Sequence, residues 1–466
     1  MGVTIVITGA ELDERRDVAI RIAGGVIREI GSAGRIGAED LVLEAKGGAV
    51  IPGLHDHHVH LRATAAALTS VDVGPPAVSD RGQLRRALAG APSGKGDWIR
   101  GVGYHESVAG LPDRFALDEL IADRPVRLQH RSGVVWLLNT AALELTGAET
   151  AREPSIERDA AGRPTGRIFR GDRWLAGAIA TPPPDLAPVG AIAARRGITS
   201  FTDADPHRDA PAVAHLAAAI GSACVPQRVC AMGQPGLELP AHPRLRRGPV
   251  KIVLDDDIAT DLDRLGTTIR LARSERRPVA IHCVTRLQLI AALTSLGDAP
   301  RAPLASKDRI EHGAIIPPEL IPELRRLELV VVTQPGFIAE RGDDYIRSVD
   351  ESASCLYRCR SLIDAGVHVL LSTDSPYSAL DPWAAIRAAG RRQTRSGATI
   401  GPAEVIPAVD ALARISGPPL RVGGPADLCI LREPLNESLS RADGPSVAAT
   451  VVGGTLAYLD DDLNGR

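Results

Sequence analysis

Lysine is scarce in this chain of 466 residues. Lysine and arginine together number 54, but only Lys46, Lys95, Lys251 and Lys307 are lysines. Positions that need only a positive charge are therefore mostly filled by arginine, which keeps its proton in proteins. Lysine can lose its proton when it is desolvated, so a lysine within the apolar stretch Val250-Lys251-Ile252 has a chemical reason to be there.

Paired cysteines, long apolar runs and a large net charge are also missing. No segment reaches the ~20 apolar residues of a membrane span, and the first residues lack the basic and apolar regions of a signal peptide. The formal net charge of -3 gives no argument for a nucleic-acid or membrane partner. These absences predict a cytoplasmic protein, and they leave a homo-oligomer open. The six cysteines lack zinc-finger spacing and are expected to be reduced; they are Cys224, Cys230, Cys283, Cys355, Cys359 and Cys429.

The length fits one large barrel of about 250 residues with smaller appendages. From about residue 185 onward, short apolar strands alternate with helical segments, which is typical of βα units and a parallel sheet. Together with a strand that ends near His58 they make eight, which predicts an α/β fold of the (β/α)8 TIM-barrel type. The other seven predicted strands are Ile198–Thr202, Gln227–Met232, Val250–Leu254, Val279–Cys283, Arg309–Glu311, Leu329–Thr333 and Val367–Ser372.

The two ends of the chain share a different pattern. Residues 1–50 alternate apolar and polar side chains with glycine at the turns, and residues 420–466 repeat this style. We therefore expect one small β-sandwich subdomain built from both ends, with the barrel in residues 51–419. Residues from about 65 to 165 carry helical runs but few clear parallel strands, and are predicted to form an insertion after the first barrel strand that shapes the substrate pocket.

A histidine cluster follows the apolar run Ala49-Val50-Ile51 and a Pro-Gly turn. In an extended strand, His58 and His60 share one face with Asp56, while His55 and His57 share the other. Either pair has the spacing to bind a metal ion. We choose His58 and His60 because they lie furthest along the strand, and the chemistry of a parallel barrel lies at the C-terminal ends of its strands.

Further polar residues occur in or just after the other predicted strands. Nitrogen and oxygen donors of this kind suit zinc and similar divalent ions. Apart from Asp203, they make with His58 and His60 a set of four histidines, a carboxylate and a lysine, which is more than one tetrahedral ion can use. These further residues are Asp203, Lys251, His282, His312 and Asp374.

Several motifs resemble those of the metal-dependent amidohydrolase superfamily. They are Pro52-Gly53-x-x-Asp56-x-His58-x-His60, Ile310-Glu311-His312, Ser372-Thr373-Asp374 and Gly424-Pro425-Ala426-Asp427-Leu428. Other segments resemble the branch called amidohydrolase family 3, or YtcJ-like. These are Trp98–Tyr104, Asn139–Leu143, Gly162–Gly166 and Val250-Lys251-Ile252. The resemblance covers nearly the whole chain and implies a (β/α)8 barrel with a β-sandwich from both chain ends.

The resemblance also implies roles for the collected residues. His58 and His60 would bind the more buried of two metal ions, with Asp374 beside them, and His282 and His312 would bind the second. A carbamate formed from CO2 on Lys251 would bridge both ions, and the resemblance implies that these are divalent metal ions, with two zinc ions expected. Asp374 would take a proton from the metal-activated hydroxide and return it to the leaving nitrogen.

Substrate contacts are predicted at Tyr104, His130 and Gln334. His105 and Glu106 are further candidates for such contacts. The chain departs from its relatives in three loops that are expected to face substrate. These departures concern substrate identity rather than reaction type. They are Ser132-Gly133-Val134, Cys283-Val284-Thr285-Arg286 and Leu254-Asp255-Asp256-Asp257.

Three functions follow from this interpretation. The favoured one is hydrolysis of an amide, formamide or similar C–N bond of a small-molecule substrate by a two-metal site. The alternative is a mononuclear-metal deaminase or related hydrolase of the same superfamily, in which Lys251 holds no metal. The third is a protein that keeps the barrel only for binding or regulation, in which the full ligand set would have little use.

Overall fold

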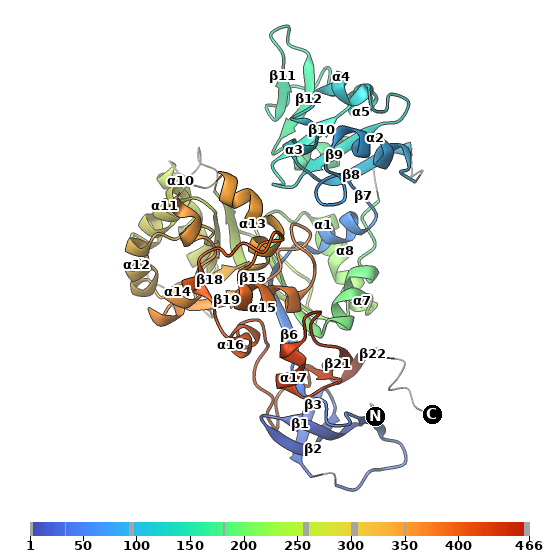
Figure 1. The fold of residues 1–466 in the computed structure, drawn as a ribbon, viewed down its shortest axis with the longest axis vertical. Coiled ribbons are helices and arrows are strands. Elements are labelled where there is room, and N and C mark those ends of the chain that lie inside the picture. The colour runs from blue at the N-terminus through green and yellow to red at the C-terminus, as the bar shows by residue number, and fades with distance from the viewer. Residues whose placement is uncertain are drawn as a thin grey trace. The chain divides into compact units, whose positions relative to one another are not determined.

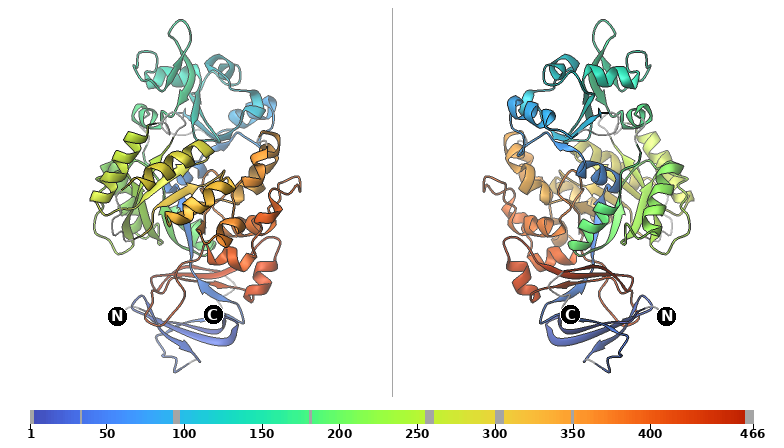
Figure 2. Two further views of the ribbon diagram at one scale, coloured as in Figure 1. Left: turned by 90° about the vertical axis from the view of Figure 1, so that its left-hand side faces the viewer. Right: turned by 90° about the vertical axis from the view of Figure 1, so that its right-hand side faces the viewer.

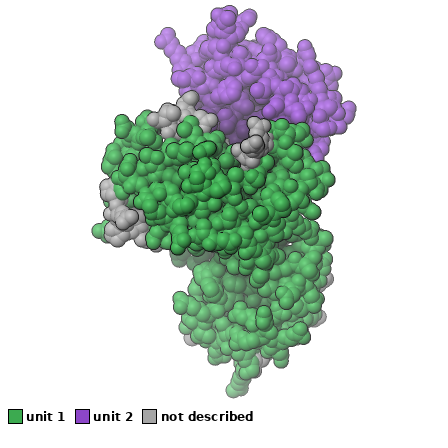
Figure 3. All heavy atoms as spheres, turned by 60° about the vertical axis from the view of Figure 1, so that its left-hand side comes forward, with its two compact units in different colours: residues 1–61, 186–466 green, residues 62–185 purple. Residues whose placement is uncertain are grey.

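The computed structural model divides the chain into two compact units, which Figure 3 shows in different colours. Unit 1 comprises residues 1–61 and 186–466, and unit 2 comprises residues 62–185. The predicted loop feature Asp255–Asp257 lies outside the described residues. The structure describes residues 3–32, 34–92, 97–179, 182–254, 261–299, 306–348 and 351–460.

A sheet of eight parallel strands forms the centre of unit 1. Each strand pairs with the next in chain order, from β6 to β19. Beyond the two edge strands, Asp374 N–H donates to the His58 carbonyl at 2.9 Å, and His60 N–H donates to the Ser375 carbonyl at 2.9 Å. The sheet is therefore a nearly closed barrel, which confirms the predicted fold class. Its strands are β6 (Leu54–Val59), β13 (Ile198–Asp203), β14 (Arg228–Gly233), β15 (Leu245–Val253), β16 (Val279–Cys283), β17 (Arg309–His312), β18 (Val330–Thr333) and β19 (His368–Leu371).

Each barrel strand overlaps a predicted one because burial on both faces gives a continuous apolar run. All four residues of β17 are buried, for example. The largest difference is at β15, which begins at Leu245 rather than Val250. Leu245 and Arg246 already pair with β14, and a register shift separates them from the apolar run that the sequence displays.

Helices lie outside these strands, as Figures 1 and 2 show. Polar caps fix several of their starts: the Asp209 side chain accepts from Ala212 N–H, and Thr285 and Gln288 form a capping box. Among the described residues, no helix is both long and apolar enough to cross a bilayer. The helices are α1 (Leu61–Leu68), which begins at the end of unit 1, and α7 (Ala187–Arg195), α8 (Ala210–Gly221), α10 (Leu262–Ser274), α11 (Arg286–Gly297), α12 (Ile321–Arg326), α13 (Gly336–Ser348), α14 (Arg360–Asp364), α15 (Pro382–Arg391), α16 (Ala408–Ala413) and α17 (Leu435–Ser440).

The β-sandwich of unit 1 is built from both chain ends, as the fold class predicts. One sheet has the order β3-β2-β1-β4 and the other β22-β21-β20-β5. Ile7 and Ile20 from the N-terminal part share one buried core with Leu428 and Val451 from the C-terminal part. The strands are β1 (Ile5–Leu12), β2 (Arg15–Ala23), β3 (Val26–Gly31), β4 (Leu41–Glu44), β5 (Val50–Pro52), β20 (Leu428–Leu431), β21 (Val447–Val452) and β22 (Thr455–Leu459).

Unit 2 contains a six-stranded mixed sheet with the order β11-β12-β10-β9-β8-β7. Strands β7, β8 and β9 are parallel, whereas β9, β10, β12 and β11 are antiparallel. This sheet was not anticipated, because its strands are short and several of them are separated by helices. Its elements are β7 (Val71–Asp72), α2 (Arg81–Ala89), β8 (Ile99–Tyr104), α3 (Glu106–Ala109), α4 (Arg114–Asp118), β9 (Val126–His130), β10 (Val135–Leu138), α5 (Thr140–Thr146), β11 (Ile156–Arg158), β12 (Pro164–Phe169) and α6 (Asp172–Ala178).

Candidate metal centre

The histidines of β6 alternate between two sides of the strand. His55 and His57 stack with their ring centroids 4.1 Å apart, and His55 Nε2 lies 2.9 Å from Thr202 Oγ1. On the other side, the buried Asp56 carboxylate accepts hydrogen bonds from Thr373 N–H at 3.0 Å and from the Thr373 hydroxyl. Asp56 thereby fastens β6 to the segment that carries Asp374, so the two parts of the site are held together.

His58, His60 and Asp374 form a group whose ligand atoms all lie within 4.8 Å of one another. Asp374 Oδ1 is 3.6 Å from His58 Nε2 and 3.4 Å from His60 Nε2. Asp374 has a φ of 59° and His312 has a φ of 68°, a left-handed conformation that is uncommon outside glycine. Strained backbone of this kind persists where the surrounding structure enforces it, and it is concentrated at functional sites.

The other proposed ligands lie beside this group. The ring centroid of His312 is 4.8 Å from that of His58 and 4.6 Å from that of His282. His312 Nδ1 lies 3.7 Å from Asp374 Oδ2. Lys251 is only 6% exposed, and its charge acts on His58, His282 and His312. The structure therefore brings all six predicted ligand residues into one region at the C-terminal end of the barrel.

Three buried polar atoms in this region have no hydrogen-bond partner within the described part of the chain. They are His58 Nε2, Asp374 Oδ1 and Lys251 Nζ. Most buried polar atoms in proteins are paired, because leaving one unpaired costs its full desolvation penalty. An imidazole nitrogen and a carboxylate oxygen are the donor atoms that zinc and similar ions take up. The residues present therefore fit a divalent metal ion.

Glu311 and Arg309 support the histidines, although neither was selected from the sequence. Glu311 accepts a hydrogen bond from His58 Nδ1, and Arg309 donates to both Glu311 oxygens at 2.7 and 3.0 Å. The proton on Nδ1 leaves the lone pair of His58 on Nε2, where it is available to a metal ion. Arg309 and Glu311 flank the apolar Ile310 with a spacing of two, which places both on one face of the strand. That spacing was the signal available in the sequence.

Gln334 was predicted to contact substrate, and the structure places it fully buried behind His312. Its Oε1 accepts from His312 Nδ1 at 3.0 Å, and its Nε2 donates to Ser372 Oγ at 2.9 Å. Gln334 thus orients His312 as Glu311 orients His58. Asp203, another strand-end residue, is also buried and forms an ion pair of 2.7 Å with Arg208.

Burial sets the protonation states of the centre. It lowers the pKa of His58 to about 3, with the charge of Lys251 adding to the effect. The pKa values of His282 and His312 are lowered by burial as well, so these rings are neutral, which is the form that binds metal. Burial by itself would raise the pKa of Asp374, but the nearby His58, His60 and His312 lower it below its usual value. Burial also lowers the pKa of Lys251, which favours its neutral amine.

The remaining predicted site residues belong to unit 2. Tyr104 lies in a buried core of that unit, its hydroxyl donates to the Gly110 carbonyl at 2.7 Å, and burial raises its pKa to about 12. His130 lies 2.8 Å from Glu106 through Nε2 and 2.7 Å from Ser132 Oγ through Nδ1. His130 and Glu106 therefore lie within hydrogen-bond distance of each other. Tyr104 instead packs in the core of unit 2, where its hydroxyl is bonded to Gly110.

Residues 41–458 match the model of a family described as the amidohydrolase family, and the chain belongs to this family. It is 25% identical to an N-substituted formamide deformylase of Arthrobacter pascens over 94% of each chain. It is 26% identical to the putative amidohydrolase YtcJ of Bacillus subtilis (strain 168) over 85% of each chain. These matches confirm the predicted family 3, YtcJ-like branch.

Solved structures show the same fold. An uncharacterized metal-dependent hydrolase from Pyrococcus furiosus matches with a TM-score of 0.69 and 20% identity, over 92% of this chain and 99% of that one. A second such hydrolase, from Pyrococcus horikoshii OT3, matches with a TM-score of 0.68 and 20% identity, over 92% and 97% of the two chains.

Proposed function

We propose that this protein is a metal-dependent hydrolase that cleaves C–N bonds other than peptide bonds in a small molecule. The observation that carries the proposal is the convergence of His58 Nε2 and Asp374 Oδ1, two buried atoms that have no hydrogen-bond partner among the described residues. Membership of the amidohydrolase family supports the same reaction class.

Each residue then has a role that its surroundings support. His58 and His60 hold the first ion beside Asp374, and His282 and His312 hold the second. A divalent ion bound there supplies a Lewis acid that lowers the pKa of water and polarises a carbonyl oxygen. Glu311 and Gln334 hold the rings of His58 and His312 in the orientation that binding needs.

Asp374 serves as the proton carrier. Its lowered pKa keeps the carboxylate ionised at neutral pH, so it can accept a proton as the water oxygen attacks the substrate carbon. The C–N bond then breaks, and Asp374 returns that proton to the departing nitrogen. The products are a carboxylic acid and an amine, so atoms and charge balance.

Lys251 is proposed to carry a carbamate, whose oxygens would supply further ligands if metal ions were bound. Burial favours its neutral amine, whose lone pair attacks CO2 with loss of one proton. The resulting carbamate carries a negative charge, which is suited to a site that binds cations. The Nζ atom has no hydrogen-bond partner among the described residues, which supports this modification, and arginine could not undergo it.

An N-substituted formamide or a simple amide is the substrate class that we favour, supported by the similarity to the deformylase over nearly the full length. The test is a panel of N-substituted formamides and N-acyl amines, with the released amine and acid quantified. Hydrolysis of at least one compound by wild type and not by Asp374→Ala is expected. Failure of the whole panel with metal-loaded protein would contradict the proposal.

A one-metal deaminase is the second candidate, because only His58, His60 and Asp374 form a compact ligand group among the described residues. Ammonia release from amino-substituted heterocycles, with one ion per chain and an unmodified Lys251, would favour it.

All six cysteines are free thiols, which is consistent with action in the cytoplasm.

A further inference from the structure

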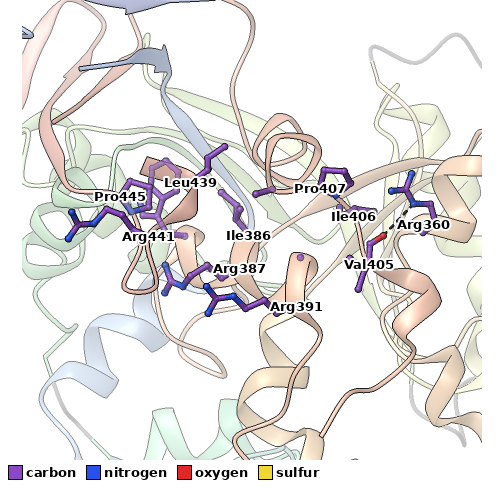
Figure 4. Close-up of a pocket in the computed structure, with 14 residues that line it drawn as sticks. Arg360, Ile386, Arg387, Arg391, Val405, Ile406, Pro407, Leu439, Arg441 and Pro445 are labelled. Carbon is purple, nitrogen blue, oxygen red and sulfur yellow. Dashed lines mark hydrogen bonds between the residues drawn. The ribbon is translucent and has the colours of Figure 1, made fainter. Parts of the chain in front are cut away.

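A cavity lies in unit 1, formed by residues outside the metal centre. Its volume is about 380 Å³, and α15, residues 405–408 and residues 439–445 supply most of its walls. Figure 4 shows these segments around it. Small-molecule sites in proteins usually begin near this size.

Three of the residues that line the cavity are apolar and almost fully buried. Trp383, Ile386 and Ile406 line it with exposed fractions of 1%, 2% and 0%. The indole Nε1 of Trp383 donates to the Arg196 carbonyl at 3.0 Å, which fixes the ring. The half-buried Leu439 and Pro445 also line the cavity, and they offer apolar surface that a ligand can reach.

The walls of the cavity carry four arginines, and none of the 14 lining residues is acidic. Arg441 is compensated by Glu433 at 2.7 Å and Asp443 at 3.2 Å. Arg360 donates to the Val405 carbonyl at 3.3 Å. These two arginines are therefore partly engaged by the protein itself.

Arg387 and Arg391 are the arginines left for a ligand. Arg387 Nη2 is 3.9 Å from Asp381, and its buried Nη1 has no hydrogen-bond partner among the described residues. Within the same ranges, Arg391 has no acidic group within 4.0 Å. The two side chains project in the same direction from α15 in Figure 4. Like charges four residues apart on a helix repel each other, so the helix is less stable for carrying this pair.

Gly444 leaves room for this arrangement. A Cβ at this position would lie 2.2 Å from Arg387 Nη1, and the φ of Gly444 is +88°, which side-chain-bearing residues rarely adopt. Any larger residue would displace the guanidinium from the cavity. The backbone thus leaves room for the Arg387 guanidinium, whose ion pair with Asp381 is as long as 3.9 Å.

We propose that this cavity binds a small amphipathic anion, with its acidic head on Arg387 and Arg391 and its apolar body on Leu439 and Pro445. Guanidinium groups bind sulfonate, phosphate and carboxylate oxygens through paired, charge-assisted hydrogen bonds. The cavity is separate from the residues that serve hydrolysis. It is therefore a second ligand site rather than part of the substrate pocket.

The test is calorimetric titration of the full-length protein with benzenesulfonate, which binds metal ions weakly. The wild type is expected to bind it saturably at one site. Arg387→Gln/Arg391→Gln should bind at least about tenfold more weakly, because the charged partners of the head group are gone. The control Arg395→Gln removes an exposed arginine just after α15 that does not line the cavity, and it should match the wild type.

Two further titrations separate the head group from the apolar body. Sulfate and benzyl alcohol should each bind more weakly than benzenesulfonate. The single variant Arg391→Gln, which changes an exposed side chain, provides the same test if the double variant does not fold. Absence of saturable benzenesulfonate binding, or equal affinity in wild type and either arginine variant, would overturn the proposal, as would sulfate binding as tightly as benzenesulfonate.

Discussion

Two histidine clusters, one in each unit, differ in how their polar atoms are satisfied. In unit 2, His105 Nδ1 lies 2.8 Å from Ser107 Oγ and its Nε2 lies 2.7 Å from Arg131 Nη2. Both ring nitrogens of His130 also have partners, Ser132 and Glu106. In unit 1, His58 Nδ1 is engaged by Glu311, whereas Nε2 has no hydrogen-bond partner among the described residues.

A histidine whose two ring nitrogens are both hydrogen-bonded has no nitrogen left for a ligand. A histidine with one nitrogen hydrogen-bonded and the other unpaired can bind one. In unit 1 a carboxylate fixes one nitrogen and leaves the other directed toward Asp374. In unit 2 the hydrogen bonds are complete, so a metal ion would have to replace them. Density of histidine alone therefore does not identify a metal site. Among the described residues, the unpartnered His58 Nε2 beside the unpartnered Asp374 Oδ1 is what distinguishes the cluster of unit 1.

The largest effect is expected from Lys251→Ala, which removes the proposed bridge between the two ions. Hydrolysis should be abolished and partly restored by a short carboxylic acid in solution, because the acid replaces the carbamate. Lys307→Ala is the control, since Lys307 is exposed and lies 3.7 Å from Glu328. Full activity in Lys251→Ala, or an unmodified Lys251 in intact mass spectra recorded without acid, would favour the one-metal alternative.

Glu311→Gln should weaken metal binding without removing a ligand. The variant keeps the size of the side chain but loses the charge that orients His58 and pairs with Arg309. Removing such a partner typically lowers metal affinity by about 10- to 100-fold. Competition with a chelator measures the change, and Glu319→Gln, at an exposed ion pair with Arg286, should leave affinity unchanged. Equal affinity in the two variants would contradict the role given to Glu311.

Glu404→Gln tests a buried cluster in which the carboxylate oxygens have hydrogen-bond partners within the protein. Glu404 accepts from Arg358 Nη1 at 2.6 Å, from the Ser361 hydroxyl at 2.6 Å, and from the Cys359 and Ser361 N–H groups. The variant should lower the free energy of unfolding by about 2 kcal/mol at pH 7, because hydrogen bonds to a charged group are lost. Metal content and hydrolysis should not change.

The difference in the free energy of unfolding between wild type and Glu404→Gln should depend on pH, because it follows from the pKa of Glu404. Burial raises this pKa, but Ser361 and Arg358 outweigh burial and hold it below the usual 4.5. The ionised carboxylate therefore stabilises the fold above about pH 4.5, and this stabilisation is lost as the pH falls through the folded-state pKa. Denaturant titrations of both proteins should converge below pH 4.5, and a constant difference at all pH values would contradict the assignment.

The smallest effect is expected from His130→Ala in unit 2. Its hydrogen bonds to Glu106 and Ser132 lie near the surface, so the loss of stability should be about 1 kcal/mol or less. Metal content should stay at the wild-type value, whereas relative activity across the formamide and amide panel should change if unit 2 shapes the substrate pocket. Loss of metal with an unchanged substrate range would contradict the claim that the cluster of unit 2 affects the substrate range and does not hold the metal.

The barrel and the grouping of polar residues at the ends of its strands could be predicted from the sequence, because both depend on short-range patterns. An apolar run that ends in a polar residue is visible at His282 or His312 without knowledge of any other strand. The roles of Glu311 and Gln334 could not be derived in this way, since each depends on which histidine lies next to it on another strand. The arginine cavity was missed for the same reason, because Arg360, Arg391 and Arg441 come together only through tertiary folding.

Metal analysis of the purified protein tests the central claim most directly. Wild type should contain between about one and two equivalents of zinc or a similar divalent ion per chain. His58→Ala and His312→Ala should each lose metal and hydrolysis, whereas His105→Ala, which changes the cluster of unit 2, should keep both. Full metal content in His58→Ala, or loss of metal in His105→Ala alone, would contradict this account.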